Sequence, residues 1–447
     1  MPRRDIGRMH HDGDDLRPSL RGSKLVDADL GPEAEDAART VELGFIRPAG
    51  RRAEAIFLRR DDTDRVEHDL NPLIADLLLE CLGRFVRQGG GKIVMVFDPD
   101  HGLASSTLRS VTVDGEDRFF LNSAHVFLHF PDKRVVVSAR QDSPWRTLIT
   151  VRSDGPPDTF FHEWEAHAKR DNYLRGRAFF ADGEIIERTR HYSWESIVMP
   201  AHVKETIRTH VEGFFRHLKA IKAYGVKPRR GLILAGPAGT GKTLLGKVLA
   251  DTLDASFTWV LPRHIEDASS FKHILALARF VAPTVLFIED LDLFAQDREA
   301  RSWVGLGELM NQLDGALENE DIVTIATTNR LEVIEKALRN RPGRFERAVI
   351  FEAMDEMGRH SMLRRLLAKA EVSAADLNYL VSATEGCTGA EIEEVTNTLF
   401  IRAIDATAQD DDDAPCGQPL PMDRAIMEAA VGEVLTKKRT RIGFNAA

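Results

Sequence analysis

The fold is decided by the stretch Gly231-Leu232-Ile233-Leu234-Ala235-Gly236-Pro237-Ala238-Gly239-Thr240-Gly241-Lys242-Thr243-Leu244-Leu245. Its first residues are small or apolar and predict a short buried strand, while its last residues begin a helical pattern. Between them stands G-x-x-x-x-G-K-T, a pattern that is specific when it lies between a strand and a helix. The stretch therefore predicts an α/β domain in which a strand leads through a phosphate-binding loop into a helix.

The residue types in this loop suit phosphate oxygens. Glycine lets backbone N–H groups turn inward, and the following helix presents the positive end of its dipole. We expect Lys242 to reach the outer phosphates of a nucleotide and the hydroxyl of Thr243 to ligate Mg²⁺. The candidate nucleotide-binding residues are Gly236, Pro237, Ala238, Gly239, Thr240, Gly241, Lys242, Thr243 and Leu244.

Outward from the loop, short apolar segments alternate with helical patterns. The strand candidates are residues 231–235, 257–261, 284–288, 322–326 and 348–351. This alternation predicts a parallel sheet covered by helices on both faces. From about residue 356 the strand patterns end, and the helical spacing of apolar residues predicts a separate C-terminal helical lid.

Polar residues follow two of these strand candidates. Glu289 and Asp290 come directly after the third, with Asp292 two residues on, and Asn329 follows the fourth. The carboxyl ends of parallel strands meet at one edge of a sheet, so we expect these side chains beside the phosphate loop. There the carboxylates would hold magnesium and orient an attacking water that Asn329 hydrogen-bonds. The alternatives are a solvated acidic turn and an Asn turn residue.

Arginines are dense around Pro342-Gly343, and they are Arg339, Arg341, Arg344 and Arg347. A solvated basic loop accounts for them, because the turn residues indicate a surface segment. The other interpretation is that they reach the γ-phosphate of a nucleotide bound by a neighbouring molecule. The sequence leaves both open.

Taken in order, these motifs resemble an AAA ATPase module over about residues 194–444, somewhat over half of the chain. Further segments that carry the resemblance are Tyr192-Ser193-Trp194-Glu195-Ser196-Ile197, Leu309-Met310-Asn311-Gln312-Leu313-Asp314-Gly315 and Arg341-Pro342-Gly343-Arg344-Phe345. The resemblance implies ATP and Mg²⁺ as cofactors and Asn329 as the sensor-one residue. It also implies that Arg341 and Arg344 are arginine fingers, which act on nucleotide in the adjacent subunit of a ring that usually has six subunits.

The resemblance adds a pair of residues in the predicted lid. Thr388-Gly389-Ala390-Glu391 has the pattern of a helix capping box, in which Thr388 caps the helix and Glu391 reaches back. In AAA proteins the matching Gly-Ala pair lies near the adenine base. Gly389 and Ala390 are therefore candidate nucleotide-binding residues as well.

The chain departs from the family pattern at two places. Glu289 precedes Asp290, whereas the usual order is Asp then Glu; here the chain resembles the mitochondrial AAA chaperones that translocate the Rieske iron–sulfur protein and their soluble bacterial relatives. Either carboxylate is then a candidate base, and Glu289 is also a candidate metal ligand together with Thr243.

The second departure is that residues 261–271 lack the aromatic-hydrophobic-glycine pore loop of protein-threading AAA rings. Arg263 and His264 would line a pore or be ordinary surface residues, so threading stays open.

The sequence ahead of the module divides into two parts. Residues 1–40 are rich in Arg, Asp, Gly and Pro and predict a mobile charged arm. Residues 41–190 predict an α+β domain with a helix from Asn71-Pro72 to Gly89, several strands and a hairpin around Asp182-Gly183. It has no motif for chemistry, and partner binding is its candidate role. The expected domains are residues 1–40, 41–190, 191–355 for the large ATPase subdomain and 356–447 for the lid.

Composition limits the remaining possibilities. The 447 residues include 60 Lys+Arg and 70 Asp+Glu, a net charge of -10, which does not support nucleic-acid binding but does not exclude it. The three cysteines have no paired spacing, so neither a disulfide framework nor a zinc site is predicted. No apolar run reaches the roughly 18 residues of a membrane span, and we expect a cytoplasmic protein.

Together these observations predict an ATP-hydrolysing AAA protein with a chaperone-like role. It would be a homo-oligomer, a hexameric ring by resemblance, that remodels a macromolecular partner, more readily a protein than a nucleic acid. The alternative is a nucleotide-dependent switch or assembly scaffold with slow turnover, because the reversed acidic pair would slow hydrolysis.

Overall fold

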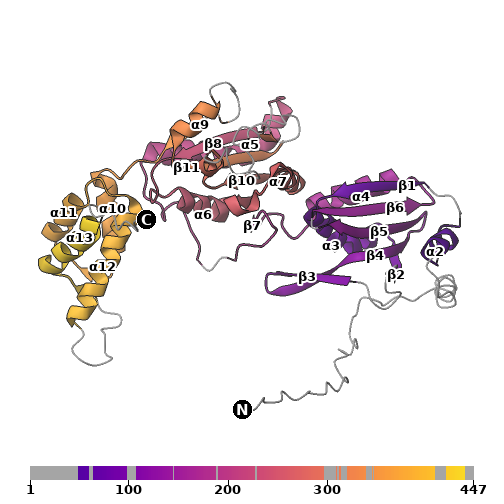
Figure 1. Ribbon diagram of the computed structural model, residues 1–447, viewed down its shortest axis with the longest axis horizontal. Helices are drawn as coiled ribbons and strands as arrows, with labels where there is room; N and C mark the ends of the chain where they lie inside the picture. The colour runs from indigo at the N-terminus through magenta and orange to yellow at the C-terminus, as the bar shows by residue number, and fades with distance from the viewer. Residues whose placement is uncertain are drawn as a thin grey trace, which may run out of the picture.

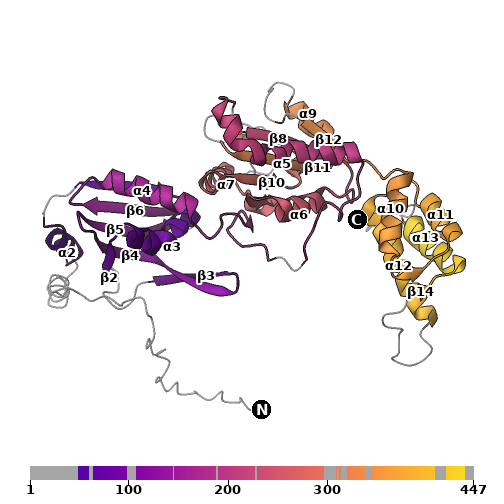
Figure 2. The ribbon, with the colours of Figure 1, turned by 180° about the vertical axis from the view of Figure 1, so that it is seen from behind.

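The computed structural model describes residues 49–59, 64–97, 107–143, 145–187, 190–226, 229–295, 309, 312–313, 320–338, 345, 347–407 and 419–437. Within these ranges three parts follow one another along the molecule (Figure 1 and, from behind, Figure 2). They are an N-terminal α+β part, a central parallel sheet with helices, and a C-terminal group of helices. The fold class predicted from the sequence is confirmed. The arm at residues 1–40 lies outside the described residues.

The central sheet has six strands in the order β12-β8-β11-β10-β9-β7. Every neighbouring pair in it is parallel. The strands are β7 (Ala178–Phe180), β8 (Arg229–Ala235), β9 (Ser256–Val260), β10 (Thr284–Ile288), β11 (Ile322–Thr328) and β12 (Arg347–Ile350). Each strand candidate of the central region is thus found, and the strand that leads into the phosphate loop lies inside the sheet.

Helices cover both faces of this sheet, as alternating side chains of each strand require. Helices α5 (Ala201–Ala223) and α6 (Lys242–Thr252) pack on the face that carries Phe287. Helices α7 (Ala268–Phe280) and α9 (Leu331–Leu338) pack on the face that carries Leu286. Both layers are apolar, so the sheet is a rigid base for the loops at its carboxyl edge.

The strand β7 differs from its prediction. The sequence assigned residues 177–180 to a hairpin of the N-terminal domain, and a bridge from Phe179 to Ile185 does close a turn there. The same strand, however, pairs in parallel with β9 and forms the edge of the central sheet. Three residues are too few for a period-two pattern to reveal which sheet a strand joins. The predicted domain boundary at residue 190 is therefore not the boundary between the two sheets.

The C-terminal part contains helices around their own apolar core. They are α10 (Glu356–Leu366), α11 (Ala374–Ala383), α12 (Gly389–Thr407) and α13 (Arg424–Lys437), with a short parallel pair β13 (Ala370–Glu371) and β14 (Leu420–Pro421). The apolar positions that predicted α12, Ile392, Val395, Leu399 and Ala403, are all buried. None of the helices in the described ranges is long and apolar enough to cross a membrane.

The N-terminal part is built on an antiparallel sheet in the order β1-β6-β5-β4-β2, with β3 paired to β4. The strands are β1 (Arg65–Leu70), β2 (Lys92–Phe97), β3 (Thr107–Val113), β4 (Glu116–His129), β5 (Arg134–Ser143) and β6 (Arg146–Ser153). Helices α3 (Pro72–Gln88) and α4 (Pro157–Arg170) bury their apolar sides on one face. Helix α2 (Ala49–Leu58) packs through Phe57 and Leu58 against Phe127 and Val136 in a separate cluster.

Helix α3 shows how local sequence sets an element. The side chain of Asn71 accepts a hydrogen bond from the backbone N–H of Leu73 at 2.8 Å, and Pro72 occupies the first helical position. The helix ends at Gly89, as predicted. The sequence missed α2, β1 and β3, because charged residues interrupt their apolar patterns.

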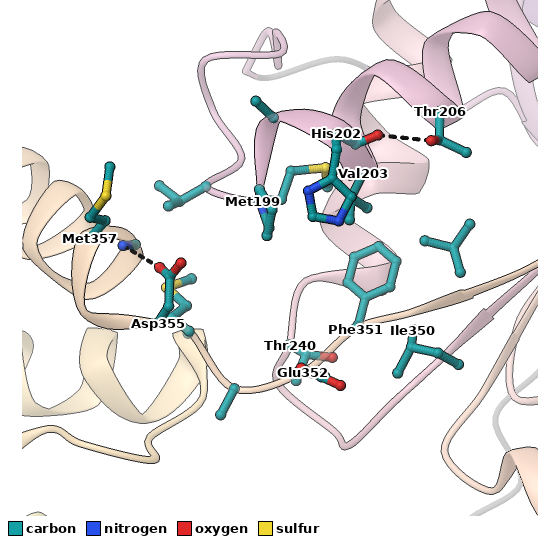
Figure 3. A pocket seen from close by; sticks show the side chains of 18 of the residues that line it. Met199, His202, Val203, Thr206, Thr240, Ile350, Phe351, Glu352, Asp355 and Met357 are labelled. Atoms are coloured by element: carbon teal, nitrogen blue, oxygen red, sulfur yellow. Dashed lines mark hydrogen bonds between the residues drawn. The ribbon is translucent and has the colours of Figure 1, made fainter.

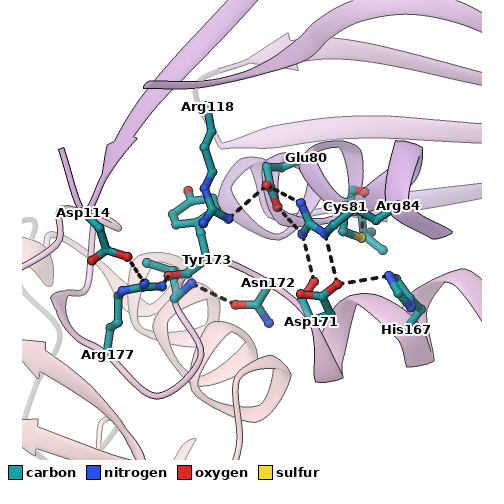
Figure 4. Close-up of polar contacts among 12 residues, drawn as sticks. Glu80, Cys81, Arg84, Asp114, Arg118, His167, Asp171, Asn172, Tyr173 and Arg177 are labelled. Carbon is teal, nitrogen blue, oxygen red and sulfur yellow. Dashed lines mark hydrogen bonds and ion pairs between the residues drawn. The ribbon is translucent and has the colours of Figure 1, made fainter. Parts of the chain in front are cut away.

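The N-terminal part is joined to the central sheet by more than the chain. Arg175 donates to the backbone oxygen of Ala282 at 2.6 Å, and the side chain of Asn71 donates to the backbone oxygen of His273 at 3.3 Å. Phe280 and Val281, at the end of α7, belong to the N-terminal core cluster. A network of charged residues around Glu80 and Arg84 ties α3 to the segment that leads toward β7 (Figure 4). The two parts therefore share a packed junction.

Candidate functional site

The loop after β8 is shaped by glycines in positive-φ conformations. At Gly236, with φ of +154°, a Cβ atom would lie 2.0 Å from the backbone oxygen of Phe351. At Gly239, with φ of +78°, a Cβ atom would lie 2.8 Å from the Cβ of Ala390. Neither position has room for a side chain, so the chain can pass between β12 and the lid only with glycine there.

Lys242 lies at the start of α6 with its ammonium group inside the loop. Its Nζ donates to the backbone oxygens of Gly236 at 2.6 Å and Pro237 at 2.8 Å, and to Oδ1 of Asn329 at 3.0 Å. Burial lowers the pKa of this ammonium, and the charges of Asp290 and Asp292 oppose that shift. Lys242 is thus a buried cation whose hydrogen bonds in the structure go to neutral oxygens.

The acidic residues that follow β10 are each placed next to a different partner. The Thr243 hydroxyl donates to Oε1 of Glu289 at 2.7 Å, while Nδ2 of Asn329 donates to Oδ1 of Asp290 at 3.2 Å. The structure therefore brings together Lys242, Thr243, Glu289, Asp290 and Asn329, which the sequence predicted as neighbours. It also separates the two carboxylates, one at the helix hydroxyl and one at the amide.

Asp292 is a residue of this site to which sequence reasoning gave no role of its own. Its side chain is 3% exposed, and Oδ1 accepts hydrogen bonds from the Thr328 hydroxyl at 2.8 Å and the Asn329 backbone N–H at 3.0 Å. The signal available was the spacing of Asp290 and Asp292 after a buried strand. That spacing could not reveal which of the two faces the neighbouring strand.

The lid reaches the loop through the start of α12. The backbone N–H of Thr388 donates to Oε2 of Glu391 at 2.7 Å, and the N–H of Glu391 donates to the Thr388 hydroxyl at 3.4 Å. The predicted capping box is therefore confirmed. The N–H of Ala390 donates to the backbone oxygen of Gly239 at 3.1 Å. The loop and the lid are in direct contact at the pair predicted to lie near the nucleotide.

A pocket of about 680 Å³ lies beside the loop (Figure 3). Its walls come from the segment ahead of α5, from β12 and the chain that follows it, and from the first turn of α10. Val198, Met199 and Phe351 supply apolar surface, while Thr240 of the loop and Gly389 of the lid form part of the lining. The pocket has both apolar and polar walls and adjoins the polar loop, an arrangement that suits a ligand with a flat apolar part and an anionic part.

Two pairs of candidate residues remain, the predicted arginine fingers and the predicted pore residues. Arg341 and Arg344 lie outside the described residues. Arg263 is exposed, whereas the side chain of His264 is 7% exposed and its Nδ1 accepts a hydrogen bond from the backbone N–H of Leu261 at 3.1 Å. Burial lowers the pKa of His264. His264 therefore belongs to the packing of its own turn.

Residues 232–353, which run from β8 past β12, match the family described as ATPase family associated with various cellular activities (AAA). This part of the chain is an AAA ATPase module. The match includes the loop, both acidic residues and Asn329, and the helices after β12 continue beyond it.

Individual relatives are similar to this chain over 216 to 236 residues. The chain is 34% identical over 217 residues to the chloroplastic ATP-dependent zinc metalloprotease FTSH 7 of Arabidopsis thaliana, covering 45% of this chain and 27% of that protein. It is 33% identical over 236 residues to the Cell division cycle protein 48 homolog of Archaeoglobus fulgidus, with 49% and 32% covered. It is 33% identical over 216 residues to the Proteasome-activating nucleotidase of Methanocaldococcus jannaschii, with 45% and 50% covered.

The chain thus spans between about a quarter and a half of the length of these relatives. The similarity to each of them covers about half of this chain.

Proposed function

We propose that this protein binds and hydrolyses ATP and acts as a ring-forming, chaperone-like AAA protein that remodels a macromolecular partner. The observation that carries the proposal is the convergence of Lys242 and Thr243 with Glu289, Asp290 and Asn329 at one edge of the sheet. The buried ammonium of Lys242 would bind phosphate. Of the two separated carboxylates, one would bind a metal ion and the other would orient a water.

The residues present fit Mg²⁺ and ATP. The Thr243 hydroxyl and the Glu289 carboxylate are oxygen donors 2.7 Å apart, and oxygen donors are the ligands that Mg²⁺ prefers. No group of three or more His, Cys, Asp or Glu residues in the described ranges could hold a metal by itself. That fits Mg²⁺, which protein sites hold through one or two carboxylates together with nucleotide phosphates. The ion would neutralise charge on the phosphates, while Thr243 and Glu289 would hold it.

The contacts also support a division of roles between the two carboxylates. The side-chain amide of Asn329 donates to Asp290 through Nδ2 and accepts from Lys242 through Oδ1. Asp290 and Asn329 would therefore both face the position expected for the γ-phosphate and the attacking water. We therefore propose Asp290 as the group that orients and deprotonates the water, with Asn329 fixing its direction. Glu289 would serve the metal through its contact with Thr243.

The nucleotide base would occupy the pocket beside the loop. The apolar part of its lining, Val198, Met199 and Phe351, suits the faces of a purine, and Gly389 and Ala390 would bring the lid against the nucleotide from the other side. A lid that touches both nucleotide and loop would change its position when the phosphates change. This is the step through which hydrolysis would move the rest of the molecule.

The ring and the partner are proposed from the AAA resemblance. Arg341 and Arg344 would complete the site of a neighbouring subunit, six of which would form the ring. The order Glu289 then Asp290 supports a relation to the AAA chaperones that translocate the Rieske iron–sulfur protein and to their soluble bacterial relatives. The N-terminal part would bind the partner, more readily a protein than a nucleic acid, in the cytoplasm.

A second candidate is a nucleotide-dependent switch or assembly scaffold with slow turnover. The observation that favours it is the shorter side chain at position 290, which places the carboxylate about one methylene further from the water than glutamate would. In that case ATP binding would control assembly and hydrolysis would only reset it.

The test measures assembly and catalysis together. The protein is sized with and without ATP while phosphate release is recorded at several protein concentrations. We expect an ATP-dependent oligomer whose turnover per subunit rises with concentration. A subunit carrying Arg341→Ala and Arg344→Ala, mixed with a Lys242→Ala subunit, should regain part of the activity, because each supplies what the other lacks. Concentration-independent turnover with no recovery in proven mixed oligomers would favour the switch.

A further inference from the structure

The strands β10 and β11 are held together beyond their backbone ladder. Their parallel pairing ends at Ile288 and Ala326. From there the backbone N–H of Asp290 donates to the Thr327 hydroxyl at 3.0 Å, and Asp292 accepts the two bonds from Thr328 and Asn329. Side chains therefore take over where backbone pairing stops, at the point where Asp290 and Asn329 face each other.

The hydrogen bonds beyond the strand ladder hold a residue in a strained backbone conformation. Asp290 has a φ of +49°, in the left-handed region that non-glycine residues rarely adopt. Such a conformation costs free energy and persists only where surrounding contacts determine it. The contacts lie on both sides of Asp290, through its own N–H and through Asp292, which turns back toward β11.

Asp292 is the most buried charged group of this arrangement. Asp292 is 3% exposed, and a buried carboxylate is costly unless it is hydrogen-bonded; its Oδ1 accepts from Thr328 and Asn329 at the end of β11. Thr328 is fully buried, and its hydroxyl also accepts from the N–H of Arg330 at 3.0 Å. This series of hydrogen bonds, from Arg330 through Thr328 to Asp292, fixes the backbone of the turn that carries Asn329.

We propose that Asp292 is a positioning residue for hydrolysis that acts through Asn329. By holding the Asn329 backbone N–H and the Thr328 hydroxyl, it fixes the amide between Lys242 at 3.0 Å and Asp290 at 3.2 Å. Asp292 itself would touch neither nucleotide nor water. The inference rests on the proposed function, because it assigns Asp292 to the hydrolytic step rather than to nucleotide binding.

The test uses the full chain with Asp292→Asn, which keeps the size of the side chain but removes its charge. We expect kcat to fall about tenfold, the loss expected when a charge-assisted hydrogen bond is weakened, while the affinity for ATP stays unchanged. In an Asn329→Ala background the same change should lower kcat no further, because the amide that Asp292 positions is gone. A purely structural role for Asp292 would lower kcat equally in both backgrounds.

A second pair of variants keeps the test decisive if Asp292→Asn does not fold. Thr328→Val removes the hydroxyl at nearly constant volume, whereas Thr328→Ser keeps it. We expect lower kcat for Thr328→Val and wild-type kcat for Thr328→Ser. Wild-type kcat in Asp292→Asn or Thr328→Val would overturn the inference and leave the proposed function standing. The same holds if Asp292→Asn lowers kcat equally in the wild-type protein and in Asn329→Ala. A folded wild-type protein that binds ATP without hydrolysing it would overturn the proposed function and the inference with it.

Discussion

The AAA module and the N-terminal part each contain a cluster of charged side chains, but the charges are balanced differently. In the N-terminal part the Glu80 carboxylate, 3% exposed, accepts two bonds from Arg84 at 2.7 and 2.8 Å, and Arg84 also donates to Asp171 at 3.0 Å (Figure 4). These bonds raise the pKa of Arg84 above its ordinary value. In the AAA module Lys242 hydrogen-bonds neutral oxygens, and burial lowers its pKa.

The difference shows how a structural network and a binding site can be told apart. Paired opposite charges that satisfy each other leave little field for a ligand and chiefly determine how elements pack. A buried cation held by carbonyl and amide oxygens keeps its charge available, which suits an anion that arrives later. Changes in the first cluster should alter stability, and changes in the second should alter binding and turnover.

The largest effect is expected for Lys242→Ala. Removing the buried ammonium takes away the charge that would face the outer phosphates, so ATP binding and turnover should fall below detection while the protein stays folded. A nucleotide titration and a phosphate-release assay measure this. Lys247→Ala, on the exposed side of the same helix, is the matched control and should behave as wild type. Unchanged ATP affinity in folded Lys242→Ala would show that the loop is only a structural turn.

Next in size is Asp290→Asn, which should retain ATP binding but slow hydrolysis by about 10²-fold, as expected for losing a base. Glu289→Gln should instead raise the Mg²⁺ concentration needed for half-maximal turnover. Single-turnover assays over a range of Mg²⁺ concentrations separate the two, with exposed Asp254→Asn as a control. If Asp290→Asn turns over normally while Glu289→Gln is inactive at saturating Mg²⁺, the two roles must be exchanged.

In the N-terminal cluster, Glu80→Gln should leave turnover per folded subunit unchanged. It removes the charge of the buried carboxylate that pairs with the partly exposed Arg84, and the free energy of unfolding should fall by about 2 kcal/mol, as expected for weakening hydrogen bonds between charged groups. Glu67→Gln, whose side chain is 44% exposed and 3.8 Å from Arg65, should cost about 1 kcal/mol or less. Urea unfolding followed by fluorescence measures both. A large fall in kcat for Glu80→Gln with unchanged stability would contradict the comparison.

The smallest effect is expected from lowering the pH, through the protonation of His68. His68 stacks on Phe161 with ring centroids 3.4 Å apart, and burial lowers its pKa below 6.5, with Asp158 and Glu165 opposing the shift and His162 adding to it. A histidine whose folded pKa is lowered favours the fold while neutral, and that stability is lost as pH falls below its unfolded pKa. The melting temperature should therefore fall between pH 7.5 and 5.5, and less steeply in His68→Phe. Equal slopes in both proteins would exclude His68 as a source.

Part of the fold was predictable because it depends on residues close in sequence. Asn71 and Pro72 begin α3 and Gly89 ends it, as expected, and the capping box of Thr388 and Glu391 is present. The buried strands around the phosphate loop were equally visible, since parallel strands covered on both faces are continuously apolar. Charged and short elements, such as β1 and β7, were missed or misplaced because their patterns carry little periodicity.

The candidate site was predictable in its members and less so in its contacts. The motifs named Lys242, Thr243, Glu289, Asp290 and Asn329, but no spacing revealed that Thr243 bonds Glu289 while Asn329 bonds Asp290. The partner of a carboxylate depends on the register of β10 against β11, which is a long-range property. For the same reason Asp292 was visible as an acidic residue and not as the acceptor for the end of β11.

The sequence by itself determined the phosphate loop, the alternation of strands and helices, and the caps of individual helices, because backbone conformation and side-chain period are set within a few residues. Only the tertiary structure decided that β7 joins the central sheet, that His264 turns inward, and that the lid touches Gly239 through Ala390. Each of these depends on residues far apart in the chain meeting in space. Such contacts form when apolar faces are buried together, and that burial depends on the whole assembly of elements rather than on any one segment.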